Sequence, residues 1–187
     1  MAVDLAFRRN AVKTLTTAVG VYVLCDLDKV PVYVGKSTDG IRKRVQRHLT
    51  SARSDVIANR QIDVWEIAFV WEYPMEGDAQ MSALEAALFH HFHPRSRLMN
   101  GTVPSKPPPK FTIPKPAKIV QVMSNEEIAE KQDLEQRLPR QAAHYAQIVA
   151  HFLVVKKSKQ IAQAMDAHFE RLAKYHKLMA GLDTDED

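Results

Sequence analysis

The sequence predicts an α/β (α+β) fold: a small β-sheet with flanking helices, followed by an all-helical C-terminal extension. Three features predict it. Two short runs rich in Val and Tyr surround a polar turn near the start, apolar and helical stretches follow, and a Pro-rich stretch precedes a second helical part. A chain of 187 residues with 45% hydrophobic content can bury a real core. We therefore expect one compact domain with an appendage.

The first predicted element is a β-hairpin. The runs from Gly20 to Cys25 and from Pro31 to Gly35 flank polar residues that suit a turn. Because side chains alternate along a strand, Tyr22 and Tyr33 can stand on the same face of this hairpin. The second run ends in glycine, which lets the chain leave the strand sharply just before Lys36.

A strongly basic helix is predicted next, from Ile41 to Arg53. Apolar residues at every fourth position would seat it on the core, and Arg44 and His48, also four apart, share the adjoining face. Both side chains can therefore converge with the two tyrosines and Lys36. The other cations of this helix are candidates for binding nucleic-acid phosphate, with a solvated basic helix as the alternative: Arg42, Lys43, Arg47 and Arg53.

The stretch from Gln61 to Tyr73 is predicted to be a third strand. Its apolar bulk would cover both faces of a small sheet. The two tryptophans in it, Trp65 and Trp71, could stack on nucleic-acid bases, but in so apolar a strand we expect them in the core.

A helix is predicted from Asp78 to about His93, where Pro94 stops it. Its apolar residues form one arc, and Glu85 falls inside that arc. An unpaired carboxylate among core residues would be costly. Either a neighbouring Arg or Lys pairs with it, or it holds a hard divalent cation with its waters, and we expect the latter because Mg²⁺ often takes only one or two protein carboxylates.

The composition changes abruptly at Gly101. Residues 101–118 hold six of the ten prolines and four lysines, so they should run extended. Beyond them, Ser124 and Glu127 predict a capping box, and one helix should end at Leu138 so that Pro139 begins the next. The expected organisation is a lead-in segment (1–17), a folded domain (18–101), a Pro/Lys-rich linker (102–118), a helical extension for DNA binding or dimerisation (119–182) and an acidic tail (183–187).

The last helical segment carries a heptad seam. Its members are spaced four, three, four, three and four residues apart: Ile161, Met165, His168, Leu172, Tyr175 and Met179. Such a seam either packs against other helices of the same chain or forms a homodimer interface. The pattern suits both alternatives equally.

Five elements in order resemble the GIY-YIG nuclease superfamily. Gly20-Val21-Tyr22 is similar to the first half of its motif, and Tyr33-Val34-Gly35 to the second half. Arg44 and His48 resemble the arginine and the His or Tyr one turn later. Downstream, Glu85 resembles the metal-binding glutamate of the family's helix, and the closing asparagine is matched by Asn100. The resemblance covers roughly residues 18 to 101 and is nearest to small stand-alone enzymes of the restriction type.

The resemblance implies a metal-dependent DNA endonuclease that hydrolyses phosphodiester bonds, of the restriction or mobile-element type. It implies one Mg²⁺ or Mn²⁺ per active site, held by Glu85, with DNA as the partner. The residues that it implies to be catalytic are Tyr22, Tyr33, Lys36, Arg44, His48, Glu85 and Asn100.

The resemblance also implies a role for each of these residues. Tyr22 would be the general base or would orient the attacking water, with Lys36 and Tyr33 easing formation of its phenolate or holding the phosphate. Arg44 would stabilise charge in the transition state. His48 would hydrogen-bond the phosphate or transfer a proton, and the asparagine would fix the loop after the helix. Whether Tyr22 or His48 removes the proton stays open.

Two alternatives belong to other functional classes. The chain could be a nucleic-acid-binding protein that keeps the fold without catalysis, or a structural assembly protein whose helical tail matters most. A single cysteine, Cys25, excludes a Cys-rich zinc module and should be a small buried hydrophobe. No apolar run approaches the ~20 residues of a membrane span. We therefore expect a soluble, cytoplasmic protein that has no membrane partner.

Overall fold

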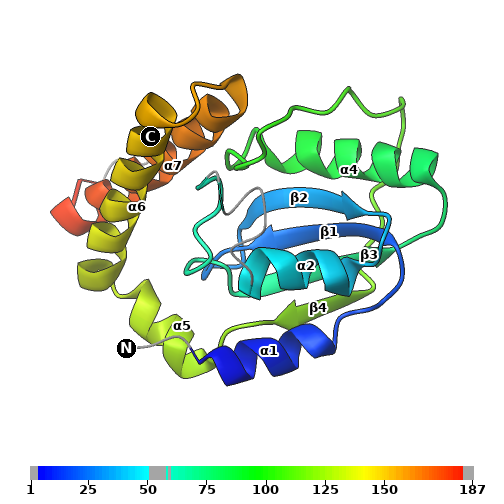
Figure 1. The fold of residues 1–187 in the computed structure, drawn as a ribbon, viewed down its shortest axis with the longest axis horizontal. Helices are drawn as coiled ribbons and strands as arrows, with labels where there is room; N and C mark the ends of the chain where they lie inside the picture. Colours follow the sequence, from blue (N-terminus) through cyan, green and yellow to red (C-terminus); the bar gives the residue numbers. More distant parts are fainter. Residues whose placement is uncertain (1–3, 51–57, 59, 183–187) are drawn as a thin grey trace.

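Four strands form one antiparallel sheet in the computed structural model of the protein. The structure describes residues 4–50, 58 and 60–182. β1 (Gly20–Cys25) lies between β2 (Pro31–Ser37) and β3 (Phe69–Pro74), and β4 (Lys118–Gln121) pairs with the other side of β3 (Figure 1). The strand order is β2-β1-β3-β4, so β2 is an edge strand. The predicted fold class, a small sheet with flanking helices and a helical extension, is confirmed.

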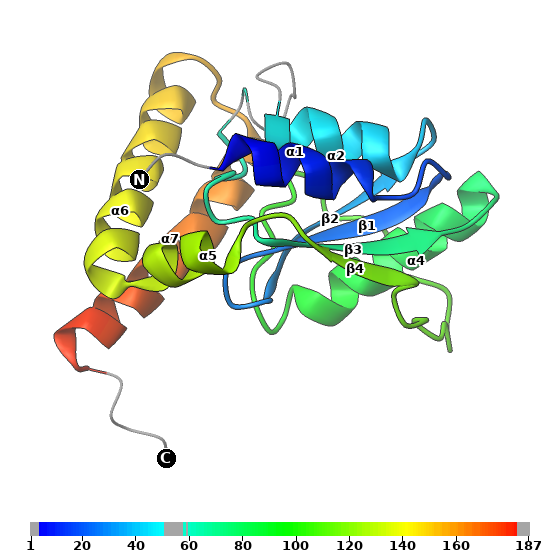
Figure 2. The ribbon, with the colours of Figure 1, turned by 90° about the horizontal axis from the view of Figure 1, so that it is seen from below.

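Helices cover both faces of the sheet (Figure 2). α1 (Leu5–Lys13) and α2 (Ile41–Thr50) pack on one face, and α4 (Asp78–Phe92) packs on the other. Alternation along β1 supplies both layers, since Tyr22 joins the core under α1 and α2 whereas Val21 joins the core under α4. The predicted helix from Ile41 to Arg53 is seen as far as Thr50, and Arg53 lies outside the described residues, as does the expected acidic tail.

The predicted third strand from Gln61 to Tyr73 is wrong in its first half, because β3 begins only at Phe69. Local turn bonds replace sheet pairing: Asp63 Oδ1 accepts from the Trp65 backbone N–H at 3.0 Å, and Asp63 O accepts from that of Glu66 at 3.1 Å. Trp65 is consequently 43% exposed rather than in the core, whereas Trp71 is half-buried against Phe92.

The expected lead-in is part of the folded unit. Arg8 of α1 is 2% exposed, and its guanidinium donates to Val64 O at 3.0 Å and to Ile67 O at 3.2 Å. Burial lowers the pKa of Arg8, and the nearby Glu127 and Asp63 charges oppose that shift. One buried arginine therefore holds the irregular segment before β3 against α1.

A short edge strand lies where the linker was expected to meet the helical extension. β4 pairs with β3 in an antiparallel register that sets Val120 opposite Val70. The helices that follow are α5 (Asn125–Gln132), α6 (Leu134–Val154) and α7 (Lys159–Ala180), and they stand at one end of the sheet (Figures 1 and 2). The first part of the expected helical extension is thus a strand.

The capping and breaking signals in the extension had different outcomes. Ser124 caps α5 as predicted, its side chain accepting from the Glu127 backbone N–H at 3.1 Å. The predicted break between Leu138 and Pro139 is wrong, since α6 runs through Pro139. The chain breaks instead at Asp133, whose side chain caps α6 through the Glu135 backbone N–H at 3.0 Å.

The heptad seam of α7 packs inside the chain. Ile161, His168 and Tyr175 are each at most 2% exposed, and α7 packs along α6. His168 Nε2 donates to Gln61 O at 3.0 Å, which ties α7 to the segment before β3. The intramolecular alternative for this seam is therefore supported, and the homodimer expectation gains nothing from it.

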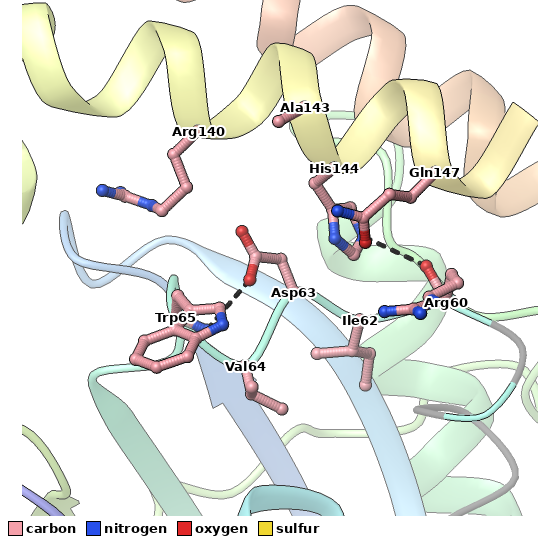
Figure 3. A pocket seen from close by; sticks show the side chains of 9 residues that line it. All are labelled: Arg60, Ile62, Asp63, Val64, Trp65, Arg140, Ala143, His144 and Gln147. Carbon is pink, nitrogen blue, oxygen red and sulfur yellow. Dashed lines mark hydrogen bonds between the residues drawn. The ribbon is translucent and has the colours of Figure 1, made fainter. Parts of the chain in front are cut away.

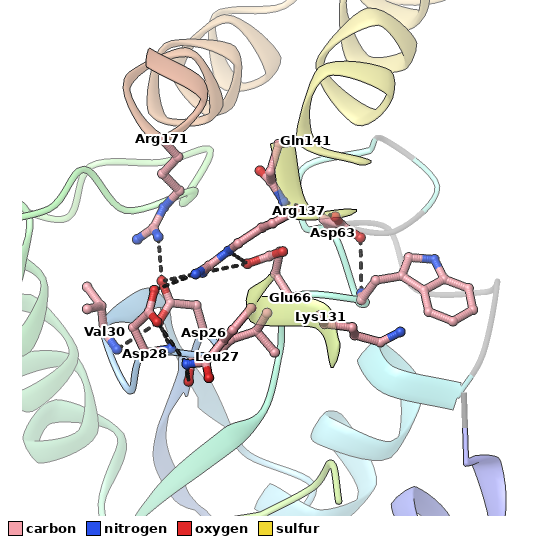
Figure 4. A network of polar contacts seen from close by, with 12 residues as sticks. Asp26, Leu27, Asp28, Val30, Asp63, Glu66, Lys131, Arg137, Gln141 and Arg171 are labelled. Atoms are coloured by element: carbon pink, nitrogen blue, oxygen red, sulfur yellow. Dashed lines mark hydrogen bonds and ion pairs between the residues drawn. The ribbon is translucent and has the colours of Figure 1, made fainter. Parts of the chain in front are cut away.

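A buried network of charges joins the helical extension to the sheet (Figure 4). We call it the ionic seam and define it as Asp26, Asp28, Glu66, Arg137, Arg140 and Arg171. Arg137 donates to Glu66 at 2.9 Å and to Asp28 at 2.7 Å. Arg171 donates to Asp26 Oδ2 at 2.6 Å and to Ser96 Oγ at 2.8 Å. The extension is therefore docked on the hairpin turn by specific ion pairs.

Two general expectations also meet the structure. Cys25 is fully buried in β1, as a small hydrophobe would be, and burial raises the pKa of its thiol well above the usual range. Among the helices that the structure describes, none combines the length and the apolar character needed to cross a membrane.

Candidate active site

Tyr22 and His48 form a buried hydrogen-bonded pair at the edge of the sheet. Tyr22 Oη lies 2.8 Å from His48 Nε2, and both side chains are at most 1% exposed. Gly35 makes this possible, because a Cβ built on it would lie 2.5 Å from Tyr22 Oη. The phenol of β1 crosses the backbone of β2 at the position opposite it in the register. The expectation that Gly35 ends the strand is wrong, because β2 continues to Ser37, and this glycine instead leaves room for the ring.

Tyr33 completes a group of three rings. Its ring centroid lies 6.2 Å from that of Tyr22 and 5.9 Å from that of His48. Tyr33 is opposite Leu24 in the register and half-buried, so it shares the face of Tyr22 as the strand alternation predicts. The hairpin therefore brings both phenols to the α2 side of the edge strand.

Arg44 of α2 reaches the same phenol. Its side chain hydrogen-bonds Tyr22 and lowers the pKa of that phenol, but burial and the neighbouring Tyr33 outweigh it, so the pKa stands well above its usual range. Tyr33 is among the causes that raise this pKa, so the expectation that it eases formation of the phenolate gains no support here, and its other expected role, holding the phosphate, stays a prediction. Tyr22 is a neutral phenol in this state, and Arg44 is the group that favours its ionisation.

Glu85 approaches from the other side of the strand. It lies on α4, is half-buried, and its charge acts on Tyr22, which it makes harder to ionise. Burial raises the pKa of Glu85, while the charge of Lys36 and a hydrogen bond from the Lys36 backbone N–H oppose that shift. The charge of Glu85 therefore acts on the Tyr22 phenol although the two side chains come from elements on opposite faces of the sheet.

Lys36 has different partners from those expected. Its ammonium group donates to Asp78 at 3.1 Å and to Ser82 at 2.7 Å, both on the first half of α4. Asp78, Ser82 and Glu85 follow one another at helical spacing, so α4 presents a polar edge to β2. Sequence reasoning missed Asp78 and Ser82, although this spacing was a signal that could have found them.

Asn100 acts as a strand partner for the outer edge of β2. Its Oδ1 accepts from the Val34 backbone N–H at 3.1 Å, and its Nδ2 donates to Val34 O at 2.7 Å. The Met99 backbone N–H donates to Val32 O at 2.7 Å. Asn100 thus fixes the segment after α4 against the motif strand, and its side chain bonds backbone rather than another side chain of the cluster.

The cations expected to bind phosphate differ among themselves. Arg42 Nε donates to Leu15 O at 2.7 Å, so this side chain joins α2 to the end of α1. Lys43 and Arg47 both contact Asp39, at 3.3 and 3.1 Å, at the exposed start of α2. Arg42 therefore has a structural contact, whereas Lys43 and Arg47 lie where an anion could displace one carboxylate.

A divalent cation fits this site only if it needs few protein ligands. In residues 4–50, 58 and 60–182, no cluster of three His, Cys, Asp or Glu side chains could hold a metal ion. Glu85 is the carboxylate whose charge acts on the Tyr22 phenol, and burial disfavours its charged form. Mg²⁺ suits such a site because it keeps most of its waters.

These side chains fall within one stretch of the chain that matches a known family. Residues 18–100 match the family model of the GIY-YIG catalytic domain. No curated protein matches the chain. The match includes β1, β2, α2, β3, α4 and Asn100, and it stops before β4 and the three C-terminal helices.

Proposed function

We propose that this chain, whose residues 18–100 match the family model of the GIY-YIG catalytic domain, is a GIY-YIG nuclease and a metal-dependent DNA endonuclease that hydrolyses phosphodiester bonds. The observation that carries the proposal is the buried 2.8 Å contact between Tyr22 Oη and His48 Nε2, with Arg44 bonded to the same phenol. A phenol that is neutral at rest needs a proton acceptor before it can act as a base. His48 supplies that acceptor at hydrogen-bond distance.

The proposed mechanism takes His48 in the tautomer whose Nε2 accepts from the Tyr22 hydroxyl. His48 takes the phenolic proton of Tyr22 as the phenol removes a proton from the attacking water, so neither group needs a stable charge before the reaction. The guanidinium of Arg44 stabilises negative charge on the Tyr22 oxygen and the negative charge that builds on the phosphate. Tyr22 is thus the group next to the water, and His48 is its proton acceptor.

Glu85 would hold the Mg²⁺ or Mn²⁺, on the side of the strand opposite α2. When bound, such an ion stabilises the charge on the leaving oxygen. The ion's positive charge would also offset the burial that now raises the pKa of Glu85. The Lys36 ammonium group, held by Asp78 and Ser82, could also contact a phosphate.

Among the finer alternatives, a stand-alone enzyme of the restriction type fits better than a mobile-element enzyme with a tethered DNA-binding module. The helical extension docks on the hairpin turn through Arg137 and Arg171, which bond Glu66 and Asp26. A tethered module would need to move relative to the nuclease domain. Sequencing the ends of cleavage products separates a fixed recognition site from structure-dependent cutting.

The test is cleavage of supercoiled plasmid with Mg²⁺ and with EDTA. We expect nicked or linear product only with the metal, and loss of product in Glu85→Gln and Tyr22→Phe. Glu76→Gln, an exposed carboxylate just before α4, is the matched control and should cut like the original chain. Metal-dependent cutting by Glu85→Gln would remove the metal assignment, and DNA binding without any cutting would favour a non-catalytic binding protein.

A further inference from the structure

A pocket lined by both polar and apolar side chains lies away from the catalytic cluster. Its volume is about 350 Å³, and it is formed between α6 and residues 60–65, the segment before β3 (Figure 3). Arg140, His144 and Gln147 reach it from the helix, facing Arg60, Asp63 and Trp65 of the segment. This volume falls in the range of small-ligand sites.

Trp65 offers a flat apolar face at the rim of this pocket. Trp65 is 43% exposed, which is unusual for so large an apolar residue. The turn bond from Asp63 fixes its backbone, and Lys131 Nζ lies 5.0 Å from its ring centroid. The indole is therefore held in place on one side and open to solvent, as a stacking platform requires.

The polar groups of the pocket are also fixed in position. Asp63 is 3% exposed, and its Oδ2 accepts from Gln141 Nε2 at 3.3 Å. His144 Nε2 donates to Arg60 O at 3.1 Å, at a residue whose φ of 58° places it in the left-handed region. α6 thus stabilises a backbone conformation that projects the exposed Arg60 at the pocket. No carboxylate of a described residue pairs with the Arg60 guanidinium.

We propose that this pocket binds an unpaired base of a single-stranded or locally opened DNA segment, with the base stacked on Trp65. A paired base in a duplex has no free face for an indole, so the ligand must be unpaired. Arg60 would contact the adjoining phosphate, because a guanidinium matches phosphate oxygens in two directions. Asp63 would accept from an amino group on the base edge, which favours cytosine over thymine.

This inference rests on the proposed function only for its choice of DNA as the partner. The pocket and the catalytic cluster use different residues, so binding of an unpaired base and cleavage can be measured separately. The proposal adds a substrate class: DNA that presents at least one unpaired nucleotide. A fully paired duplex would use the catalytic side alone.

The two tryptophans make a direct test available. In Trp71→Phe, Trp65 is the sole indole, and in Trp65→Phe only the half-buried Trp71 remains. Each full-length variant is titrated in EDTA with a dC octamer, a dT octamer and a blunt duplex. We expect quenching of Trp65 by the dC octamer, weaker binding of the dT octamer, and no quenching by the duplex. Trp71 should not respond to any of them.

Affinity for a labelled dC octamer, read by fluorescence anisotropy, gives the second test. Trp65→Ala should bind about 5- to 100-fold more weakly, as loss of one stacked base predicts. Trp65→Phe keeps an aromatic face and should retain most of the affinity. Phe169→Ala removes another exposed aromatic, one that is 54% exposed on α7, and should change nothing. Thermal melting checks that each variant is folded.

Several results would overturn the proposal. They are equal affinities for Trp65→Ala and the original chain, equal quenching by octamer and duplex, or quenching of Trp71 alone. Plasmid cleavage with no response at Trp65 would remove the pocket and leave the proposed nuclease intact. A Trp65 response without metal-dependent cleavage would support the pocket and contradict the nuclease proposal.

Discussion

Two buried polar regions of this chain, the ionic seam and the catalytic cluster, differ in how their charges are balanced. In the ionic seam, three carboxylates meet three guanidinium groups: Asp26, Asp28 and Glu66 with Arg137, Arg140 and Arg171. In the catalytic cluster, Tyr22 is a neutral phenol bonded to His48, and burial also disfavours the charge on Glu85. The ionic seam pairs carboxylates with guanidinium groups, whereas in the catalytic cluster burial disfavours the charged forms of Tyr22 and Glu85.

The ionic seam positions the segments that carry the candidate site, whereas the catalytic cluster holds the side chains proposed to perform the chemistry. Arg171 alone contacts three segments, through Asp26 Oδ2, Pro31 O and Ser96 Oγ. These are the hairpin turn, the start of β2 and the segment that leads to Asn100. A buried ion pair contributes little net free energy compared with apolar packing, but removal of one partner is expensive. We therefore expect seam variants to lose stability, and cluster variants to lose activity in a folded protein.

The largest effect should follow removal of a seam arginine. Arg137→Ala leaves Glu66 buried with one partner fewer, so the free energy of unfolding should fall by about 3–5 kcal/mol. Urea unfolding followed by circular dichroism measures it, with Arg9→Ala as the control because Arg9 is exposed on α1. A loss equal to that of the control would show that the extension is not docked through this seam.

Arg44→Ala should lower activity without lowering stability. Loss of the group that stabilises negative charge at the phosphate should lower kcat by about 10²–10³-fold, with an unchanged melting temperature. Plasmid-cleavage kinetics and thermal melting on the same preparation test both parts. A large drop in melting temperature would place Arg44 with the structural group, where Arg42 already belongs through its bond to Leu15 O.

The next effect, from His168, concerns how the stability of the folded protein depends on pH. Burial first, then His144 and Arg171, lower its pKa to about 3, while its bond to Gln61 O opposes the shift. The folded state therefore binds fewer protons than the unfolded state between an unfolded pKa near 6.5 and the folded value, so stability is full above that range and falls on acidification. From pH 7 to pH 5 this histidine should remove about 2 kcal/mol.

The measurement is urea unfolding at pH 7 and pH 5. His168→Gln lacks the titrating ring and should lose correspondingly less stability than the original chain over this interval. Equal pH dependence in the two proteins would contradict the assignment. At pH 7, the activity of folded His168→Gln should differ little from that of the original chain, since His168 lies in the helical extension and not beside Tyr22.

The smallest effect should come from Lys43→Ala. This side chain is 67% exposed and contacts Asp39 at the surface, so its contribution to stability is below about 1 kcal/mol. DNA binding should weaken, and its salt dependence should flatten by about one counterion. Binding titrations over a range of salt concentrations measure this, and an unchanged slope would remove Lys43 from the DNA contact surface.

Sequence reasoning named most of the residues that the structure brings together in the candidate site, because the signals for them are local. Tyr22 and Tyr33 alternate correctly in their strands, Arg44 and His48 are one helical turn apart, and Glu85 falls on the inner arc of its helix. Such spacings within a single strand or helix can be read from the sequence without knowing which distant segments pack against it. The family resemblance joined these elements, and the match over residues 18–100 confirms it.

Only the tertiary structure decided the features that depend on distant partners. The four residues of β4 are too few to show a period, and they form a strand because β3 offers an open edge. Trp65 is exposed because an aspartate turn and the distant Arg8 hold its segment out of the sheet. The heptad seam suited two partners equally, and only the contacts with α6 and Gln61 show that most of it packs within the chain, with Met179 at its end 40% exposed. The physical reason is that periodicity shows which face of a segment is apolar, whereas its burial depends on which other segment is close enough to cover it.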